Sequence, residues 1–334
     1  MIQDAKNIVI SSRIRLARNL KEYKFTNRIS EEDSNKIVQK VASSLSNNGE
    51  YRVYSMKPLD FYDAMIMQEK HLISSKLAEN KFGAVLVSKN EEVSIMVNEE
   101  DHIRAQCIKK GLSLEDAYTE LAQIDDYLSE CMEYAFDDNL GYLTACVTNL
   151  GTGMRASCMM FLPAITLSES VSSLVSFASS KGLTVRGIYG EGTLADGYMY
   201  QISNSISLGL SEREIICNVK DVVMRIVALE NSERKRLLQT KFIEIKDRIL
   251  RAWGICTNAY KLNSTEILKY LGDLKFGVMC DIIRLKDASI LDLLSTQCMP
   301  HNIRKISEKN LTQEEIEVFR AKYVASSLKG KRIL

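Results

Sequence analysis

The sequence predicts an α+β protein with a largely antiparallel sheet flanked by helices, followed by an all-helical C-terminal domain. Two apolar runs, 83–88 and 93–97, enclose the polar turn 89–92, which indicates a β-hairpin. Helix and strand patterns are mixed in the first two thirds of the chain. After about residue 230 only helical spacing remains. We therefore divide the chain into an α+β domain at 1–225 and a helical domain at 226–334.

The spacing of apolar residues predicts helices at 33–48 and 59–79. Ser113, with an acid three residues later, resembles a capping box that opens a helix running to about residue 135. The remaining expected elements are a helix at 171–181 ending at Gly182, strands at 183–188 and 199–203, a long helix capped by Ser211, and helical segments at 231–251, 264–280, 287–297 and 312–328.

Composition excludes several classes of protein. The 334 residues are 46% hydrophobic and 26% charged with a net charge of +1, so bulk charge does not indicate nucleic-acid or membrane binding. There is no apolar N-terminal segment and no run long enough to span a bilayer, so we expect a cytoplasmic protein. None of the eight cysteines forms a CxxC pair, and three scattered histidines are too few for a histidine-based metal site.

The run Asn-Glu-Glu-Asp-His at 98–102 places three carboxylates and a histidine directly after an apolar strand. Acids this close repel one another unless cations surround them. We expect Glu100 to carry chemistry, and Glu99, Asp101 and His102 to position it or hold the turn.

Three arginine-bearing motifs could supply the cations. Ser-Ser-Arg-Ile-Arg at 11–15 places two arginines on one side of an extended segment; a solvated strand face is the alternative. The loop 146–157 has two glycines, several hydroxyls and Arg155, but lacks the Gly-Lys-Ser/Thr of a P-loop, so a tight turn is the alternative. The loop 186–193 carries Arg186 and Glu191 among glycines, and alone it would be an ordinary loop.

Together these motifs favour one chemistry. Five arginines lie near turns or strands with Glu100 and Glu191 beside them, and the arginines are Arg13, Arg15, Arg104, Arg155 and Arg186. Such a set suits a polyphosphate whose charge must be neutralised and a cationic acceptor held by carboxylates. The sequence therefore favours phosphoryl transfer to a basic group. His71 lies in an amphipathic segment, where a helix-surface histidine is the alternative to a site residue.

The motifs Ser-Ser-Arg-Ile-Arg, Asn-Glu-Glu-Asp-His, Cys-x-Thr-Asn-x-Gly-Thr and Arg-Gly-x-x-Gly-Glu occur in this order over residues 8–215. In this the chain resembles the guanidino (phosphagen) kinases, and among them the bacterial protein-arginine kinases. Small-molecule members carry a helical domain before the Ser-Ser-Arg motif. Here that motif begins at Ser11, so we expect that domain to be absent and the site to be open to a macromolecule.

The resemblance implies a role for each matching residue. It implies Glu100, Glu191 and Cys146 as catalytic residues, ATP with Mg²⁺ as cofactors, and no metal ligands from the protein itself. The implied nucleotide-binding residues are Ser11, Ser12, Arg13, Ile14, Arg15, His71, Arg104, Arg155, Ala156, Ser157, Cys158, Met159, Arg186, Gly187, Ile188, Tyr189, Gly190 and Glu191.

The resemblance also implies a biological setting: protein substrates marked for a Clp-type protease, a stress-response repressor among them, a zinc-finger activator and a homodimer, with no direct nucleic acid or membrane. A small-molecule guanidino kinase and a non-catalytic adaptor remain as alternatives. The family's Arg-Asp-x-x-Arg-Ala motif is altered, because Ile316 and Glu317 replace its first two residues. This departure argues against autoregulation by phosphoarginine.

Overall fold

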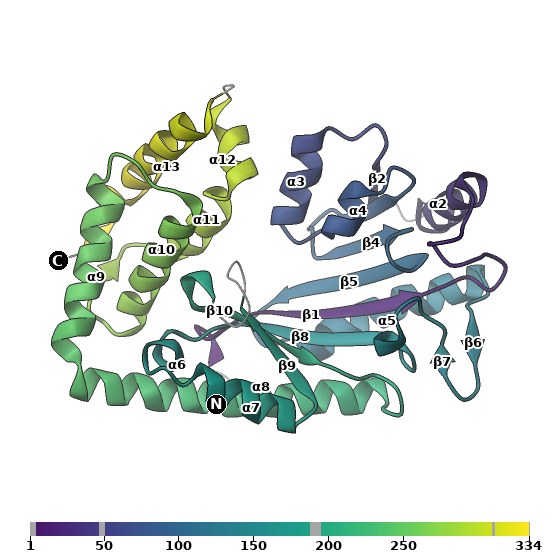
Figure 1. The fold of residues 1–334 in the computed structure, drawn as a ribbon, viewed down its shortest axis with the longest axis horizontal. Coiled ribbons are helices and arrows are strands. Elements are labelled where there is room, and N and C mark those ends of the chain that lie inside the picture. The colour runs from purple at the N-terminus through teal and green to yellow at the C-terminus, as the bar shows by residue number, and fades with distance from the viewer. Residues whose placement is uncertain (1–4, 47–50, 188–194, 309–310, 334) are drawn as a thin grey trace.

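The computed structural model describes residues 5–46, 51–187, 195–308 and 311–333. Its centre is an eight-stranded sheet in the order β2-β3-β4-β5-β1-β8-β10-β9, with every neighbouring pair antiparallel (Figure 1). The predicted α+β fold and the predicted hairpin are confirmed. The strands are β1 (Val9–Arg18), β2 (Tyr51–Ser55), β3 (Ala84–Ser88), β4 (Val93–Val97), β5 (Ile103–Lys110), β8 (Met154–Phe161), β9 (Leu183–Gly187) and β10 (Met199–Asn204).

The two faces of the sheet differ in chemistry. Side chains alternate along each strand, so Ile14 and Leu16 of β1 share a face with Ala156 and Cys158 of β8. This face belongs to the largest buried apolar cluster, which also includes residues of α5 (Leu114–Cys131) and α8 (Glu212–Thr240). In Figure 1, α8 runs below the sheet and α5 lies behind it. The arginines of β1 belong to the opposite face.

The segment 59–79 is not one helix as predicted. It forms α3 (Phe61–Glu69) and α4 (Ser75–Glu79), which follow α2 (Glu31–Ser46) and β2. Between α3 and α4, His71 has a left-handed backbone with φ 61°. Its carbonyl accepts a hydrogen bond of 2.6 Å from Gln106 Nε2 on β5. This contact with the sheet holds the turn that separates the two helices, so His71 does not lie on a helix surface.

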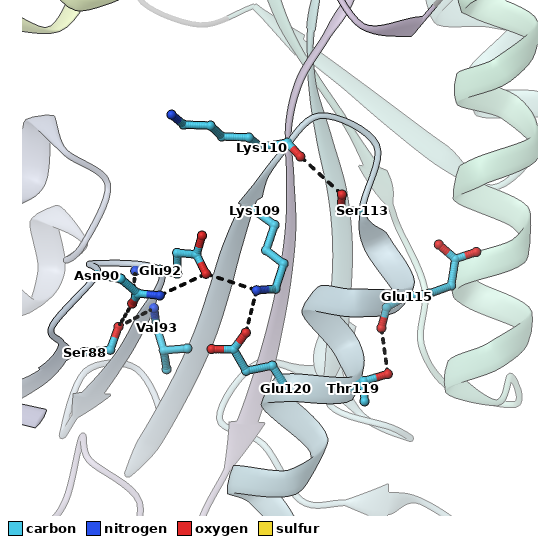
Figure 2. A network of polar contacts seen from close by, with 10 residues as sticks. All are labelled: Ser88, Asn90, Glu92, Val93, Lys109, Lys110, Ser113, Glu115, Thr119 and Glu120. Carbon is cyan, nitrogen blue, oxygen red and sulfur yellow. Dashed lines mark hydrogen bonds and ion pairs between the residues drawn. The ribbon is translucent and has the colours of Figure 1, made fainter. Parts of the chain in front are cut away.

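The predicted capping box at the start of α5 is wrong. Ser113 makes no side-chain bond to the helix N-terminus, and its hydroxyl donates instead to the carbonyl of Lys110 at 3.2 Å (Figure 2). The neighbouring Lys109 contacts Glu92 at 3.0 Å and Glu120 at 2.6 Å. Figure 2 shows this lysine joining the turn after β3 to α5 across β5. The pKa of Lys109 is raised, chiefly by its hydrogen bond to Glu120.

The helical region, residues 242–328, is connected to the sheet by α8. This helix begins with a capping box formed by Ser211 and Glu214, and it runs through the predicted domain boundary at residue 225. The helix α12 was not predicted, although Pro300 stands at its first position. The remaining elements are α6 (Pro163–Leu167), α7 (Val171–Ser180), α9 (Phe242–Asn258), α10 (Ser264–Met279), α11 (Ser289–Gln297), α12 (Pro300–Ser307), α13 (Gln313–Leu328), the short strands β6 (Phe136–Asp137), β7 (Gly141–Tyr142), β11 (Arg284–Leu285) and β12 (Arg332–Ile333), and the 3₁₀ turns η1 (Val147–Asn149) and η2 (Asp196–Tyr198).

None of the helices in the described part of the chain is both long and apolar enough to cross a membrane.

Candidate active site

Strand register places the five predicted arginines on one face of the sheet. Arg15 of β1 lies directly opposite Arg155 of β8, and Arg13 shares their face because it is two residues from Arg15. Arg104 of β5 pairs with Ala17, which has the same parity as both β1 arginines. Arg186 of β9 reaches the same face through its register with β10 and β8. Four strands, β5, β1, β8 and β9, thus contribute arginines to one cationic surface, with β10 lying between β8 and β9.

These arginines repel one another. The pKa of Arg13 is lowered to about 10, first by burial and then by Arg104 and Arg155. Burial followed by the neighbouring arginines also lowers the pKa of Arg15, well below its usual value. The Nε atoms of Arg15 and Arg155 are buried without a hydrogen-bond partner among the described residues. Among the described residues, Arg104 is the one arginine of the five with an ion-pair partner, so the cluster keeps an excess of positive charge that fits a polyphosphate ligand such as the one ATP provides.

Two cavities lie on this face and share His71. The first has a volume of 480 Å³ and is lined by Arg13, Arg15 and Arg104 of the sheet together with residues of α3 and α12. The second has a volume of 230 Å³ and is mainly apolar; it is lined by Ser11 and Met159 of the sheet and by residues of α10 and α11. Burial and the charge of Arg13 lower the pKa of His71, which favours its neutral form.

Glu99 forms an ion pair with Arg104. Its carboxylate lies 2.7 Å from Arg104 Nη1 and also accepts hydrogen bonds from the Ser74 hydroxyl at 2.5 Å and the Glu100 N–H at 2.6 Å. Burial alone would raise the pKa of Glu99, but Arg104 and the two other donors hold it below its usual value. Glu99 therefore stays ionised and fixes the position of one cavity arginine.

Asp101 and His102 hold the turn. Asp101 Oδ1 accepts from Asn19 Nδ2 at 2.6 Å and from the Ala145 N–H at 2.7 Å. His102 Nδ1 accepts from the Leu20 N–H at 3.0 Å, so its Nε2 carries the proton and donates to a backbone carbonyl at 2.8 Å. Asp101 and His102 thus hold the turn, and Glu99 bonds the backbone of Glu100, in keeping with the expectation that these residues position Glu100 or hold the turn.

Glu100 is the acid of this run that remains available. It is half-buried, and its backbone carbonyl accepts a bond of 2.5 Å from the Thr26 hydroxyl. Among the residues that the structure describes, none forms a hydrogen bond or ion pair with its carboxylate. A carboxylate held by its backbone and free at its tip is suited to receive a cationic group.

Cys146 is tied to the acidic turn through its neighbour, because Ala145 is bonded to Asp101. The Cys146 thiol lies 3.0 Å from the Thr148 hydroxyl and close enough to Arg155 to influence the pKa of that arginine. The loop needs Gly151, since it has φ 94° and an added Cβ would lie 2.6 Å from the Ser207 carbonyl oxygen.

Not every predicted residue points into the site. The side chains of Ser12, Ile14, Ala156 and Cys158 face the opposite side of the sheet, where they are fully buried. Ser12 donates to the Gly111 carbonyl at 2.8 Å, and burial raises the pKa of Cys158 to about 12. Side-chain contact of these four with a nucleotide on the arginine face is therefore excluded by strand alternation. Ser157 and Met159 do belong to the arginine face, and Gly187 ends β9 beside it. The predicted residues Ile188, Tyr189, Gly190 and Glu191 lie outside the described residues.

Three supporting residues were not found from the sequence. Asn19 bonds Asp101 and also the Leu143 carbonyl at 3.0 Å, while Ser74 bonds Glu99 and Gln106 bonds the turn at His71. Each acts across the fold on a residue far away in the chain, and no local pattern marks such a contact.

One residue of the altered C-terminal motif, Arg320, has a structural role in the helical region. Arg320 is fully buried in α13, where its Nε donates to the Cys298 carbonyl at 2.8 Å and its Nη1 to the Leu262 carbonyl at 2.9 Å. This arginine joins three segments of the helical region.

Comparison with known families agrees with the fold. Residues 33–233 match the family described as ATP:guanido phosphotransferase, C-terminal catalytic domain, and residues 242–332 match the Protein-arginine kinase McsB C-terminal domain. The Protein-arginine kinase of Clostridium tetani is 43% identical over 329 residues, covering 98% of this chain and 97% of that protein. The Protein-arginine kinase of Bacillus subtilis is 39% identical over 335 residues, covering 98% and 92%.

Solved structures show the same fold at lower identity. The substrate-free duplicated taurocyamine kinase from Schistosoma mansoni has a TM-score of 0.63 at 23% identity, over 80% of this chain and 40% of that one. Lombricine kinase has a TM-score of 0.61 at 24% identity, over 68% and 67%. These likenesses concern the fold alone, whereas the full-length relatives identify the family. The chain belongs to the protein-arginine kinases, a family of ATP:guanido phosphotransferases.

Proposed function

We propose that this protein transfers the γ-phosphate of ATP to arginine side chains of proteins. The observation that carries the proposal is the arginine face: five arginines from four strands, with lowered pKa values for Arg13, Arg15 and Arg155. Glu100 lies in the turn before β5, and its carboxylate has no partner among the described residues. The arginines would hold the phosphates, and Mg²⁺ bound with ATP would spread their charge further.

The carboxylates would act on the acceptor. A free guanidinium has a pKa above about 12, so it is a poor nucleophile while it is protonated. We assign Glu100 and Glu191 to hold it in a bidentate manner and to accept its proton as the N–P bond forms. Cys146 lies near Arg155, and a thiolate there would add a further negative partner for the acceptor. Alignment of acceptor and phosphate would then supply much of the rate enhancement.

To test this proposal, the protein is incubated with Mg-ATP and a basic protein. The phosphorylated residues of the basic protein are then mapped under non-acidic conditions, because phosphoarginine is acid-labile. Phosphoarginine on the protein substrate supports the proposal. Free arginine and creatine are tested in parallel, and phosphorylation confined to them would instead support a small-molecule guanidino kinase. Tight nucleotide binding with no product from any acceptor would support a non-catalytic adaptor.

From the family resemblance we further propose the cellular setting. The protein would act in the cytoplasm as a homodimer, respond to a zinc-finger activator, and mark proteins, including a stress-response repressor, for a Clp-type protease. Degradation of a phosphorylated substrate by a Clp-type protease, compared with the same substrate after removal of its phosphoarginine, tests the main element of this setting.

A further inference from the structure

The helical region is attached to the sheet side of the molecule at a close-packed apolar contact. Phe161 and Tyr198 belong to the buried cluster of the helical region. A Cβ added to Gly272 of α10 would lie 3.0 Å from the Cα of Gly197, so the two backbones are almost in contact. The Tyr198 hydroxyl also donates to Asp273 at 2.5 Å. Dense packing with satisfied polar groups makes this attachment rigid.

A second attachment is polar and depends on one carboxylate. Glu69 ends α3 and contacts the first turn of α12, 232 residues away in the chain. Its oxygens accept from the backbone N–H groups of His301 at 2.8 Å and Asn302 at 2.9 Å, and from the side chains of the same residues at 2.8 Å and 2.6 Å. A carboxylate at this position satisfies unpaired N–H groups and interacts favourably with the helix dipole.

The same turn of α12 forms a wall of the arginine cavity. The cavity of 480 Å³ is lined by Arg13, Arg15 and Arg104 on the sheet and by the segment 299–301 of the helical region. Glu69 lines the cavity itself and contacts His301. In Figure 1, α12 faces α3 above the sheet. The position of this wall is therefore set by the Glu69 contact.

Little else holds α3 against α12. The buried apolar cluster beside α3 and that of the helical region share no described residue. The rings of Phe61 and Tyr62 each contact the His301 ring, but Phe61 remains 63% exposed and Tyr62 46% exposed. The ion pair between Lys305 and Asp63 is solvent-exposed and contributes little. Glu69, with its side chain only 9% exposed, is the main connection.

We propose that Glu69 is a positioning residue that latches α12 over the arginine cavity, and that release of this contact lets the nucleotide enter and leave. The proposal rests on the proposed function, in which this cavity holds the phosphates of ATP. The rigid attachment at Gly197 and Gly272 keeps the helical region in place while the polar contact opens. Nucleotide exchange is thereby coupled to the helical region.

The test uses the full chain with Glu69→Ala and measures release of a fluorescent ATP analogue with Mg²⁺ by stopped flow. We expect release about ten-fold faster than in the wild type, which corresponds to about 1.4 kcal/mol. Asn302→Ala removes one donor and is expected to give a smaller change in the same direction. Asp63→Ala is the matched control, because it removes only the exposed ion pair of the same interface.

Hydrogen exchange supplies a readout that separates a latch from general loosening. In the wild type, Mg-ATP should slow exchange of the amides in 301–307, and in Glu69→Ala those amides should exchange quickly with or without Mg-ATP. Unchanged nucleotide release in both Glu69→Ala and Asn302→Ala, despite faster exchange in α12, would overturn the latch and leave the proposed function intact. Failure of the wild type to bind the analogue would overturn both.

Discussion

Replacing Asp101 with asparagine should destabilise the protein and disturb both acceptor-side loops together. Asp101 bonds both the segment after β1, through Asn19, and the loop before Cys146, through the Ala145 N–H. Its second oxygen, Oδ2, is buried without a described partner. In Asp101→Asn the shared acceptor becomes neutral, and an amide NH₂ group occupies a position that offers it no acceptor.

The magnitude follows from these contacts. Charge-assisted hydrogen bonds are about twice as strong as neutral ones, so the two bonds together lose about 1–2 kcal/mol. The unsatisfied NH₂ group costs about 1–3 kcal/mol more. Burial raises the pKa of Asp101, which means that removing the charge relieves part of this cost. The free energy of unfolding should therefore fall by about 2–3 kcal/mol.

Urea unfolding with linear extrapolation measures this change, and phosphorylation of an arginine-containing protein at a temperature where the variant is folded measures its effect on the site. Asp126→Asn is the matched control, since Asp126 is exposed on α5 and should change stability by less than about 0.5 kcal/mol. Wild-type stability and activity in Asp101→Asn would refute the assigned role.

Three further outcomes are expected. Glu230 accepts hydrogen bonds from the two N–H groups at the start of α6, and burial raises its pKa to about 7. Because the folded form binds the proton more tightly, the free energy of unfolding should fall as pH rises from about 4.5 to about 7. Glu230→Gln should flatten that decline in urea unfolding measured against pH, whereas an unchanged slope would contradict the assignment. Gly151→Ala places a Cβ 2.6 Å from the Ser207 carbonyl oxygen at a φ of 94°, so it should lower both the midpoint of thermal unfolding and activity; wild-type values would show that the loop relaxes freely. Arg18→Ala removes the ion-pair partner that lies 2.7 Å from Asp125. The free energy of unfolding, measured with urea, should fall by about 3–5 kcal/mol, and a fall of less than about 1 kcal/mol would contradict a buried ion pair there.

Local sequence pattern was enough to predict strands of the sheet. For the arginine face, the sequence could predict which residues belong to it but not how they are arranged. The apolar runs at 83–88 and 93–97, joined by the short polar turn 89–92, predict a hairpin. The register that places Arg15 opposite Arg155 joins segments 140 positions apart, and no local pattern encodes such a pairing. The sequence could therefore group the arginines by motif, and only the fold could place them together.

The helix at 59–79 was mispredicted for a related reason. Neither glycine nor proline interrupts that stretch, so local propensity favours one helix. Contact of the His71 carbonyl with Gln106 overrides that propensity and imposes a left-handed residue. In the same way, the sequence cannot distinguish the roles of the adjacent acids Glu99 and Glu100, since both carry the same charge. The structure distinguishes them because Arg104 forms an ion pair with Glu99.

The measurement that tests the central claim most directly is phosphorylation of protein arginines by the wild type and by Glu100→Gln under identical conditions. With Mg-ATP and a basic protein, the wild type should form acid-labile phosphoarginine. Glu100→Gln should retain binding of ATP to the arginine face but lose about 10²-fold or more in the rate of transfer, because the carboxylate that accepts the proton is gone. Equal rates of phosphoarginine formation by the two proteins would contradict the account.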